Sequence, residues 1–152
     1  QNGEKIHHRG IRPVHIFVTA DRRGKYHVKL GGFETAKVES DSVYIKTVGI
    51  NAKEKMETNC FIPLEVRNKD IDELQGIDWE KVDVYSMAVL LLYCLDRKEV
   101  ADTIDEGVFY DYFSDEFCDV LCDILMNSIN EKPSLEELEK ALEKELKSIR
   151  ER

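Results

Sequence analysis

Apolar side chains occupy nearly every position from residue 84 to residue 95, and this run dominates the hydrophobic pattern of the chain. A helix without a polar face must be surrounded by protein or lipid. A membrane span needs about 20 apolar residues, and here the preceding turn is charged. The pattern therefore predicts a buried central helix over residues 79–95. Because a lone buried carboxylate is costly, we expect Asp83 to meet a specific group from elsewhere in the chain.

Two short runs of β-branched and aromatic residues precede this helix. They span residues 14–19 and 25–30, on either side of a turn-like Asp-Arg-Arg-Gly sequence. This arrangement predicts a small β-hairpin over residues 14–30. The stretch 31–59 is polar, and we expect a long loop there with at most one short strand, over residues 43–48.

Helical periodicity continues to the end of the chain, so we expect C-terminal helices over residues 115–152. Before them we expect a short helix over residues 98–106 and an aromatic cluster at residues 109–113 that belongs to the core. Ser134 followed by Glu137 forms a capping box that opens the last helix. The apolar stripe of this helix is narrow, and we expect it to pack on the domain, with a partner helix as the alternative. The stripe consists of Leu135, Leu138, Leu142, Leu146 and Ile149.

Together these elements predict a mainly helical α+β fold in one domain over residues 1–152, built around the central helix with a small hairpin. The net charge of -9 argues against nucleic acid and anionic membranes as partners. The four cysteines lack the spacing of a disulfide framework, which indicates a reducing compartment. No signal peptide or membrane segment is visible. We therefore expect an intracellular protein, cytoplasmic or nuclear.

Four stretches, read in order, resemble motifs of protein kinases. Residues 8–18 resemble the catalytic loop His-Arg-Asp-x-Lys-Pro-x-Asn and the strand after it, and residues 28–37 resemble the strand that carries Asp-Phe-Gly. Pro63-Leu64-Glu65 stands at the Ala-Pro-Glu position, which makes residues 32–65 the equivalent of the activation segment. Residues 83–88 resemble Asp-x-Trp-Ser-x-Gly, at the head of the family's buried central helix. Because order and spacing agree, the chain is similar to the C-terminal lobe of a Ser/Thr kinase.

The chain departs from the kinase pattern at the catalytic positions. Gly10 replaces the Asp that accepts the proton of the substrate hydroxyl in the family. His15 and Gly32 replace the Asn and Asp that hold magnesium, a hard ion that prefers oxygen ligands. The resemblance therefore implies a catalytically inactive pseudokinase that uses no metal and no cofactor.

The positions that serve architecture in the family are kept. His8 and Phe33 match two residues that stack within the lobe, and Asp83 matches the carboxylate that receives backbone N–H groups of the catalytic loop. Glu65 matches the carboxylate that pairs with a basic residue before the last helix, where this chain has Lys132 in place of Arg. Because lysine lacks the bidentate fork, we expect that bridge to be weak.

Two arginines are candidates for anion contacts. Arg9 matches the arginine that grips a phosphorylated activation loop in the family, and Arg12 keeps the charge of the catalytic-loop lysine. We favour the alternatives, a solvated loop with incidental hydroxyl groups and a surface arginine. The candidate phosphorylation positions are Ser40, Ser42, Tyr44 and Thr47.

The resemblance begins at the catalytic loop, so the N-terminal lobe and the helix before this loop are absent from it. The apolar surface of the central helix should then stay exposed unless another chain, an oligomer or a missing N-terminal lobe covers it. We therefore expect a protein-binding, scaffolding or allosteric regulatory module. The enzymatic alternative is a divergent phosphotransferase whose nucleotide-binding lobe lies elsewhere, and within the matched motif only Glu34 could supply its acidic metal ligand. A third interpretation, an unrelated helical domain, predicts that His8, Phe33 and Asp83 do not converge.

Overall fold

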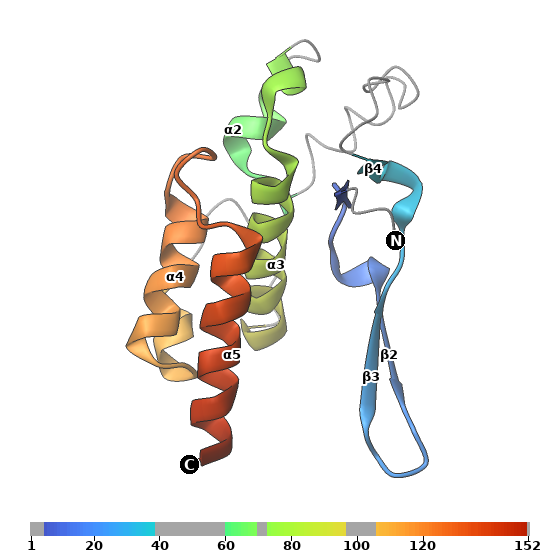
Figure 1. Cartoon of the computed structure of the whole chain (residues 1–152), viewed down its shortest axis with the longest axis vertical. Helices are drawn as coiled ribbons and strands as arrows, with labels where there is room; N and C mark the ends of the chain where they lie inside the picture. The colour runs from blue at the N-terminus through green and yellow to red at the C-terminus, as the bar shows by residue number, and fades with distance from the viewer. Residues whose placement is uncertain (1–4, 39–59, 70–72, 97–105, 152) are drawn as a thin grey trace.

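The computed structural model describes residues 5–38, 60–69, 73–96 and 106–151, and the architecture is a mixture of helices and two small sheets (Figure 1). The strands are β1 Ile6–His7, β2 Ile16–Ala20, β3 Tyr26–Leu30 and β4 Lys37–Val38, and the helices are α2 Leu64–Arg67, α3 Trp79–Asp96, α4 Asp115–Met126 and α5 Leu135–Glu151. Short 3-10 turns cover Pro13–His15, Phe33–Thr35, Glu73–Gly76 and Glu106–Asp111. The predicted α+β class is confirmed at this level. The strand expected over residues 43–48 and most of the short helix expected over residues 98–106 lie outside the described residues.

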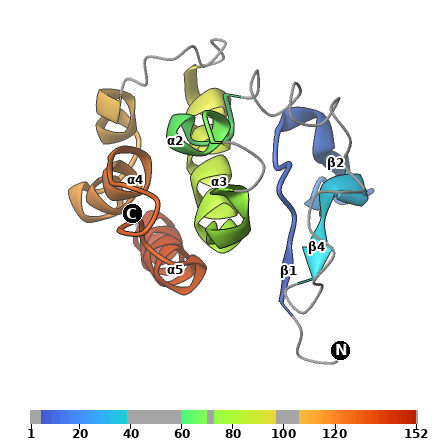
Figure 2. The same cartoon turned by 90° about the horizontal axis from the view of Figure 1, so that it is seen from above.

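Helix α3 is the centre of the helical half of the molecule. It begins where the Asp78 carboxylate accepts the backbone N–H of Glu80, at 3.0 Å, in the manner of an N-cap. Apolar residues follow on all sides, and α4 and α5 pack against it (Figure 2). The predicted buried central helix is therefore confirmed. Its buried apolar side chains are Trp79, Val82, Val84, Tyr85, Ala88, Val89 and Leu92.

The aromatic cluster before α4 is only partly in the core. Phe109 is fully buried, and Phe113 packs edge-on against Phe117 with ring centroids 5.2 Å apart. Tyr110 and Tyr112 are exposed, which corrects the prediction that the whole cluster is buried. The reason is local, since the cluster begins inside the 3-10 helix Glu106–Asp111 and continues beyond its end, so its consecutive side chains project in different directions.

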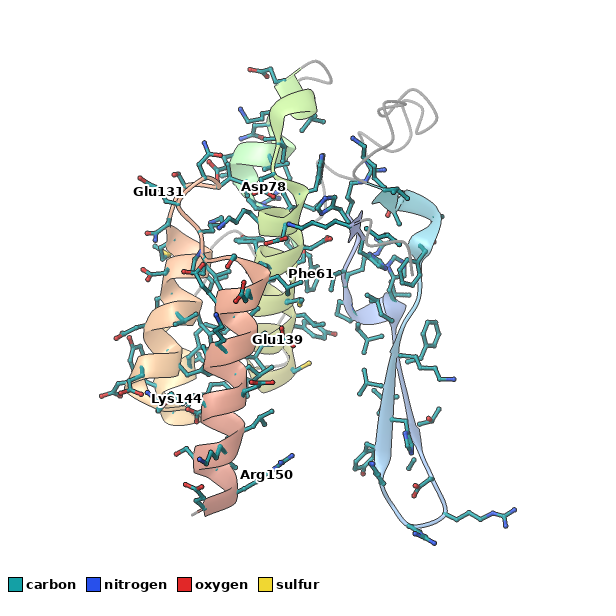
Figure 3. All side chains as sticks on the ribbon, in the orientation of Figure 1. Phe61, Asp78, Glu131, Glu139, Lys144 and Arg150 are labelled. Carbon is teal, nitrogen blue, oxygen red and sulfur yellow. The ribbon has the colours of Figure 1, made fainter. Side chains whose placement is uncertain are left out.

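Helix α5 contacts its neighbours through a different face from the predicted leucine stripe. Only Leu138 of the stripe is buried, whereas the other four side chains are 41–44% exposed. The contact face instead includes Ala141 and Glu145, and Lys144 reaches toward α4 to pair with Glu116 (Figure 3). The buried Glu145 carboxylate accepts hydrogen bonds from the backbone N–H and the hydroxyl of Ser114, and these bonds set the rotation of the helix.

The hairpin of β2 and β3 projects beside α3, and all but one of its strand residues are exposed (Figure 1). The register pairs Ile16 with Leu30, Val18 with Val28 and Ala20 with Tyr26. The turn is closed by Asp21, whose carboxylate accepts the backbone N–H groups of Arg23 and Lys25. The predicted hairpin is confirmed, although residues 13–15 form a 3-10 turn because proline favours the first position of a helical turn.

A second small sheet pairs β1 with β4 in antiparallel register, and it brings the first described residues beside residues 37–38. Strand β1 also contacts α3. Loop residues 8–15 and 31–35 are thereby held next to the first turns of α3. Within the described part of the chain, no helix combines the length and the apolar character that a membrane crossing requires. The four cysteines form no disulfide bond.

Candidate functional site

Asp83 holds the loop that follows β1 against the central helix. Its two carboxylate oxygens accept the backbone N–H groups of His8, at 2.6 Å, and of Arg9, at 2.8 Å. Burial raises the pKa of Asp83 above its ordinary value, and the two N–H donors oppose that rise. The specific partner expected for this carboxylate is therefore the loop backbone, about 75 residues earlier in the chain.

His8 and Phe33 lie at the same junction. Their rings meet edge-on with centroids 4.8 Å apart, and the Nε2–H of His8 donates to the Gly31 carbonyl at 2.8 Å. This hydrogen bond fixes Nε2 as the protonated nitrogen of the buried imidazole. His8, Phe33 and Asp83 therefore lie at one junction.

The three positions that depart from the kinase pattern touch one another. The Nδ1–H of His15 donates to the Gly10 carbonyl at 2.7 Å. The imidazole also lies directly over Gly32, where an added β-carbon would come within 2.4 Å of the ring. Gly32 has a φ of 77°, in the left-handed region that favours glycine. An aspartate at position 32 would therefore need both a strained backbone and the space that His15 fills.

Thr35 occupies the space beside Gly10, a role that the sequence did not reveal. A β-carbon on Gly10 would lie 2.9 Å from the Thr35 hydroxyl oxygen, and this hydroxyl donates to the His8 carbonyl at 3.2 Å. The only indication of this packing in the sequence is that position 10 is a glycine, which leaves space for a neighbouring side chain. The loop interior is thus packed with an imidazole and a hydroxyl group and presents no carboxylate of its own.

Glu34, the one acid considered as a metal ligand, is an exposed residue that lies beside His15. Its side chain is 67% exposed, and its Oε1 atom lies 3.7 Å from His15 Nε2. Among the described residues, no group of three or more His, Cys, Asp and Glu side chains is arranged to hold a metal ion. The geometry therefore offers Mg²⁺ at most one exposed carboxylate at this loop.

Arg9 and Arg12, the predicted anion contacts, differ in surroundings. Arg9 has a φ of 60°, its Nε donates to the Thr35 carbonyl at 2.6 Å, and its guanidinium group lies 5.4 Å from the centre of the Trp79 ring. The Nε atom of Arg12 is buried without a hydrogen-bond partner among the described residues. The candidate phosphorylation positions Ser40, Ser42, Tyr44 and Thr47 lie outside the described residues, so the structure does not place them relative to either arginine.

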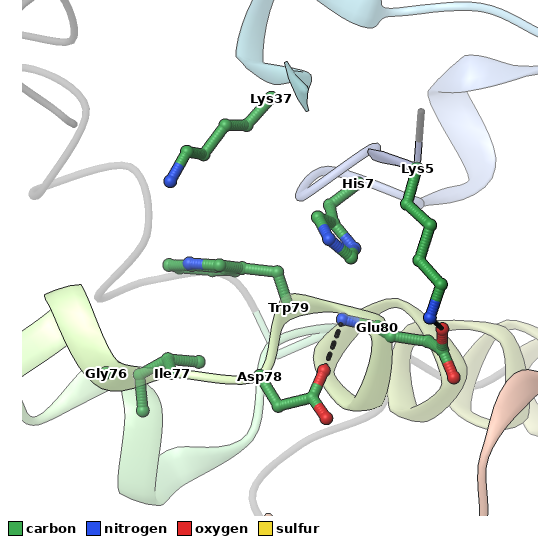
Figure 4. Close-up of a pocket in the computed structure, with 8 residues that line it drawn as sticks. All are labelled: Lys5, His7, Lys37, Gly76, Ile77, Asp78, Trp79 and Glu80. Atoms are coloured by element: carbon green, nitrogen blue, oxygen red, sulfur yellow. Dashed lines mark hydrogen bonds and ion pairs between the residues drawn. The ribbon is translucent and has the colours of Figure 1, made fainter. Parts of the chain in front are cut away.

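An open depression of about 330 Å³ is lined in part by Trp79 (Figure 4). Three basic side chains reach it from the β1–β4 sheet, namely Lys5, His7 and Lys37. The depression also contains Asp78 and Glu80, and Glu80 pairs with Lys5 at 3.2 Å. Because acids and bases are mixed, the depression has no strong preference for anions. Sequence reasoning overlooked it because its residues come from three distant segments.

Glu65 and Lys132 do not form the predicted ion pair. The Lys132 side chain is buried, and its Nζ atom donates to the carbonyl of Ile124 at 2.8 Å and to that of Asn127 at 2.5 Å. Burial lowers the pKa of Lys132, while the charge of Glu65 acts in the opposite direction. The unpaired carbonyls at the end of α4 are a nearer and better aligned set of acceptors than Glu65, and this explains the difference.

Comparison with models of protein families, with curated proteins and with solved structures found no match to this chain. Any functional assignment therefore depends on the residues and their geometry. That geometry consists of a loop fixed by the partly buried Asp83 carboxylate and filled by His15 and Thr35, beside an exposed hairpin.

Proposed function

We propose that this chain is a catalytically inactive kinase-like C-terminal lobe that acts as a protein-binding, scaffolding or regulatory module. The observation that carries the proposal is the packing of Gly10, His15 and Gly32. These three positions would hold the base and the metal ligands of an active kinase, and here the His15 ring contacts both glycines. None of these three positions supplies a carboxylate, either as the base for a hydroxyl nucleophile or as an oxygen ligand for Mg²⁺.

The retained loop anchor supports the same proposal. Asp83 accepts two backbone N–H groups, and the His8 ring packs edge-on against Phe33. These contacts keep the loop in a defined conformation although it lacks catalytic side chains. A loop that keeps a defined conformation but lacks catalytic side chains can form part of a binding surface.

The hairpin supplies the binding surface in this proposal. Side chains alternate between the two faces of a strand, and the register places only apolar residues on one face. The members of this hairpin face are Ile16, Val18, Ala20, Tyr26, Val28 and Leu30. Those apart from Ile16 are exposed, Tyr26 to 73% and Val28 to 66%. Exposed apolar patches of this kind mark interaction sites.

Helix α3 extends this apolar surface. Met87, Leu90 and Cys94 follow Asp83 at helical spacing, so they lie on the side of α3 that carries the loop anchor. The hairpin runs beside this helix in both views (Figures 1 and 2). Met87 and Leu90 are only partly buried. A partner segment could therefore contact the hairpin face and α3 together.

The charge of the hairpin indicates what kind of segment fits. The sequence from Ile16 to Leu30 contains four cations and one Asp, in a chain whose net charge is -9. A partner with an apolar face flanked by acidic side chains would complement both properties. We propose that this partner is a protein segment, provided by another chain or by an N-terminal lobe.

Two experiments test the proposed function. In the first, thermal unfolding is followed with and without millimolar ATP and Mg²⁺. We expect no shift, whereas a Mg²⁺-dependent rise in the unfolding temperature would favour the phosphotransferase alternative. In the second, a photo-crosslinking residue replaces Val28, on the apolar face, or Lys29, on the opposite face, in the cells that make the protein. We expect a crosslinked protein from position 28 only, and equal crosslinking from both positions would contradict a binding site on this face.

A further inference from the structure

Helix α5 has an apolar stripe that the rest of the described residues leave partly exposed. The side chains of Leu135, Leu142, Leu146 and Ile149 are each 41–44% exposed, and they define the α5 stripe. Their spacing of seven, four and three residues places them on one side of the helix. Heptad-like spacing of this kind is typical of helices that pair with another helix.

The charges beside the α5 stripe follow a simple order along the helix. With 3.6 residues per turn, five charged residues fall along the edge of the stripe that is remote from the buried Leu138 and Glu145. In chain order these edge residues are Glu136, Glu139, Glu143, Lys147 and Arg150. Lys144 lies on the opposite side of the helix from Glu139 and Arg150 (Figure 3). The edge is therefore acidic in its first half and basic in its second half.

We propose that the partner of the α5 stripe is the same helix of a second copy, in antiparallel orientation. Glu136 and Arg150 are each seven residues from Glu143, and Glu139 and Lys147 are each four residues from it. A two-fold axis near residue 143 therefore places Glu136 and Glu139 of one helix beside Arg150 and Lys147 of the other. It also brings the two copies of Glu143 together, so four opposite-charge pairs are set against one like-charge pair. In a parallel pair this edge would face the opposite edge of the partner helix, so these complementary contacts would not form.

The size of the contact and the net charge set limits on this dimer. A helix of 17 residues is about 25 Å long. A single pair of such helices buries less than the roughly 1,200–2,000 Å² of a stable complex. The net charge of -9 on each copy also opposes association. We therefore expect a dimer that dissociates on dilution, in which the complementary edges select the orientation.

Sedimentation velocity of the full chain over a concentration series tests the existence of the dimer. The wild-type chain should shift from monomer to dimer as concentration rises, and Leu142→Glu should remain monomeric. Met126→Gln is the matched control, because Met126 is exposed and lies on α4 away from the stripe. Val28→Asp should also leave the dimer unchanged, which separates this contact from the proposed hairpin surface. A wild-type chain that stays monomeric throughout would overturn the proposal.

Charge reversal tests the antiparallel orientation. Glu139→Lys and Lys147→Glu should each weaken the dimer several-fold, because each places like charges together. The double variant restores complementary pairs and should recover most of the lost affinity. If the double variant is weaker than either single variant, the helices do not pair in this orientation. Circular dichroism of each variant verifies that the fold is retained, as expected for exposed side chains.

Discussion

The imidazole of His15 fills the space that a side chain on Gly32 would need. An ideal β-carbon at Gly32 would lie 2.4 Å from two ring carbons of His15 and 2.5 Å from its Nδ1. The ring is held in place by its hydrogen bond to the Gly10 carbonyl. Positions 10, 15 and 32 are therefore coupled through the His15 ring, and a change at one of them alters the packing at the others.

Gly32→Ala should destabilise the fold through two separable costs. The left-handed backbone, with φ of 77°, costs a non-glycine residue about 1–2 kcal/mol, and overpacking against His15 adds about 1–3 kcal/mol. Gly24→Ala is the control, because Gly24 has the same φ and nothing within 4 Å of its β-carbon position. Urea denaturation of the wild type, Gly24→Ala and Gly32→Ala measures both losses in the free energy of unfolding. Equal losses for the two variants would show that the His15 ring moves aside freely.

His15→Ala should reduce the damage caused by Gly32→Ala. Removal of the ring leaves room for the new methyl group, so the two substitutions should interact by about 1–3 kcal/mol in a double-mutant cycle. The hydrogen bond to Gly10 is lost in both His15 variants and therefore cancels in the cycle. Strict additivity would mean that the two residues are independent.

Asp83→Asn should change the pH dependence of stability with a defined sign. Because the pKa of Asp83 in the folded state exceeds its ordinary value of 3.8, the folded state binds the proton more tightly than the unfolded chain. The stability contributed by this carboxyl group therefore falls as pH rises from about 3.8 through the folded-state pKa. The free-energy difference between wild type and Asp83→Asn should shrink over this interval. Denaturation between pH 3 and pH 7 measures it.

Asp21 provides a matched control, because the stability that its carboxyl group contributes should change with pH in the opposite direction. It also accepts two backbone N–H groups, but it is exposed, and those bonds lower its pKa below 3.8. Its contribution to stability is present above the ordinary pKa and is lost as pH falls through the lowered value. The difference between wild type and Asp21→Asn should therefore grow with pH. Parallel slopes for the two variants would contradict the argument from burial.

The elements that the sequence predicted correctly are those specified by local patterns. An uninterrupted apolar run predicted α3, and two β-branched runs around a turn predicted the hairpin. The orientation of α5 was not predictable in this way. Leu142 and Leu146 looked like contact residues, but the helix is rotated so that Glu145 reaches Ser114 at the start of α4. That rotation depends on a hydrogen-bond donor, Ser114, which lies 31 residues earlier in the chain. The spacing of apolar residues within α5 contains no information about this donor.

The candidate site shows the same division between local and distant information. The motif matches identified Gly10, His15 and Gly32 as departures and His8, Phe33 and Asp83 as a group that should converge. They could not reveal that His15 would occupy the space above Gly32 or that Thr35 would fill the space beside Gly10. In both cases a side chain of one segment fills the space left by a glycine about 20 residues away in the chain. The sequence between the two segments shows no pattern that would indicate this contact.

Lys132→Met should destabilise the fold although it removes a buried charge. The Nζ atom donates to the carbonyls of Ile124 and Asn127 at the end of α4, and methionine would leave both carbonyls without this donor. We expect a loss of about 2–4 kcal/mol in the free energy of unfolding. Lys140→Met, at an exposed position of α5, should leave stability nearly unchanged. A neutral Lys132→Met would show that water replaces the ammonium group.

Glu145→Leu distinguishes a hydrophobic role for position 145 from its role as a cap of α4. The apolar pattern of α5 suggests that leucine here would add a buried contact and stabilise the fold. The structure predicts the opposite, because the buried carboxylate accepts the backbone N–H and the hydroxyl of Ser114, just before the first turn of α4. A negative charge is also favourable at a helix N-terminus. We expect Glu145→Leu to cost about 1–3 kcal/mol, measured by chemical denaturation.

A double-mutant cycle with Ser114→Ala assigns that cost to the cap. Alanine removes the hydroxyl donor, so in its background Glu145→Leu should cost less than it does in the wild-type chain. The coupling should be about 0.5–3 kcal/mol, the range for residues joined by buried hydrogen bonds. The remaining cost reflects the backbone N–H, which alanine retains. If Glu145→Leu instead raises stability in both backgrounds, hydrophobic burial outweighs the cap, and α5 is rotated by its apolar contacts and not by Glu145.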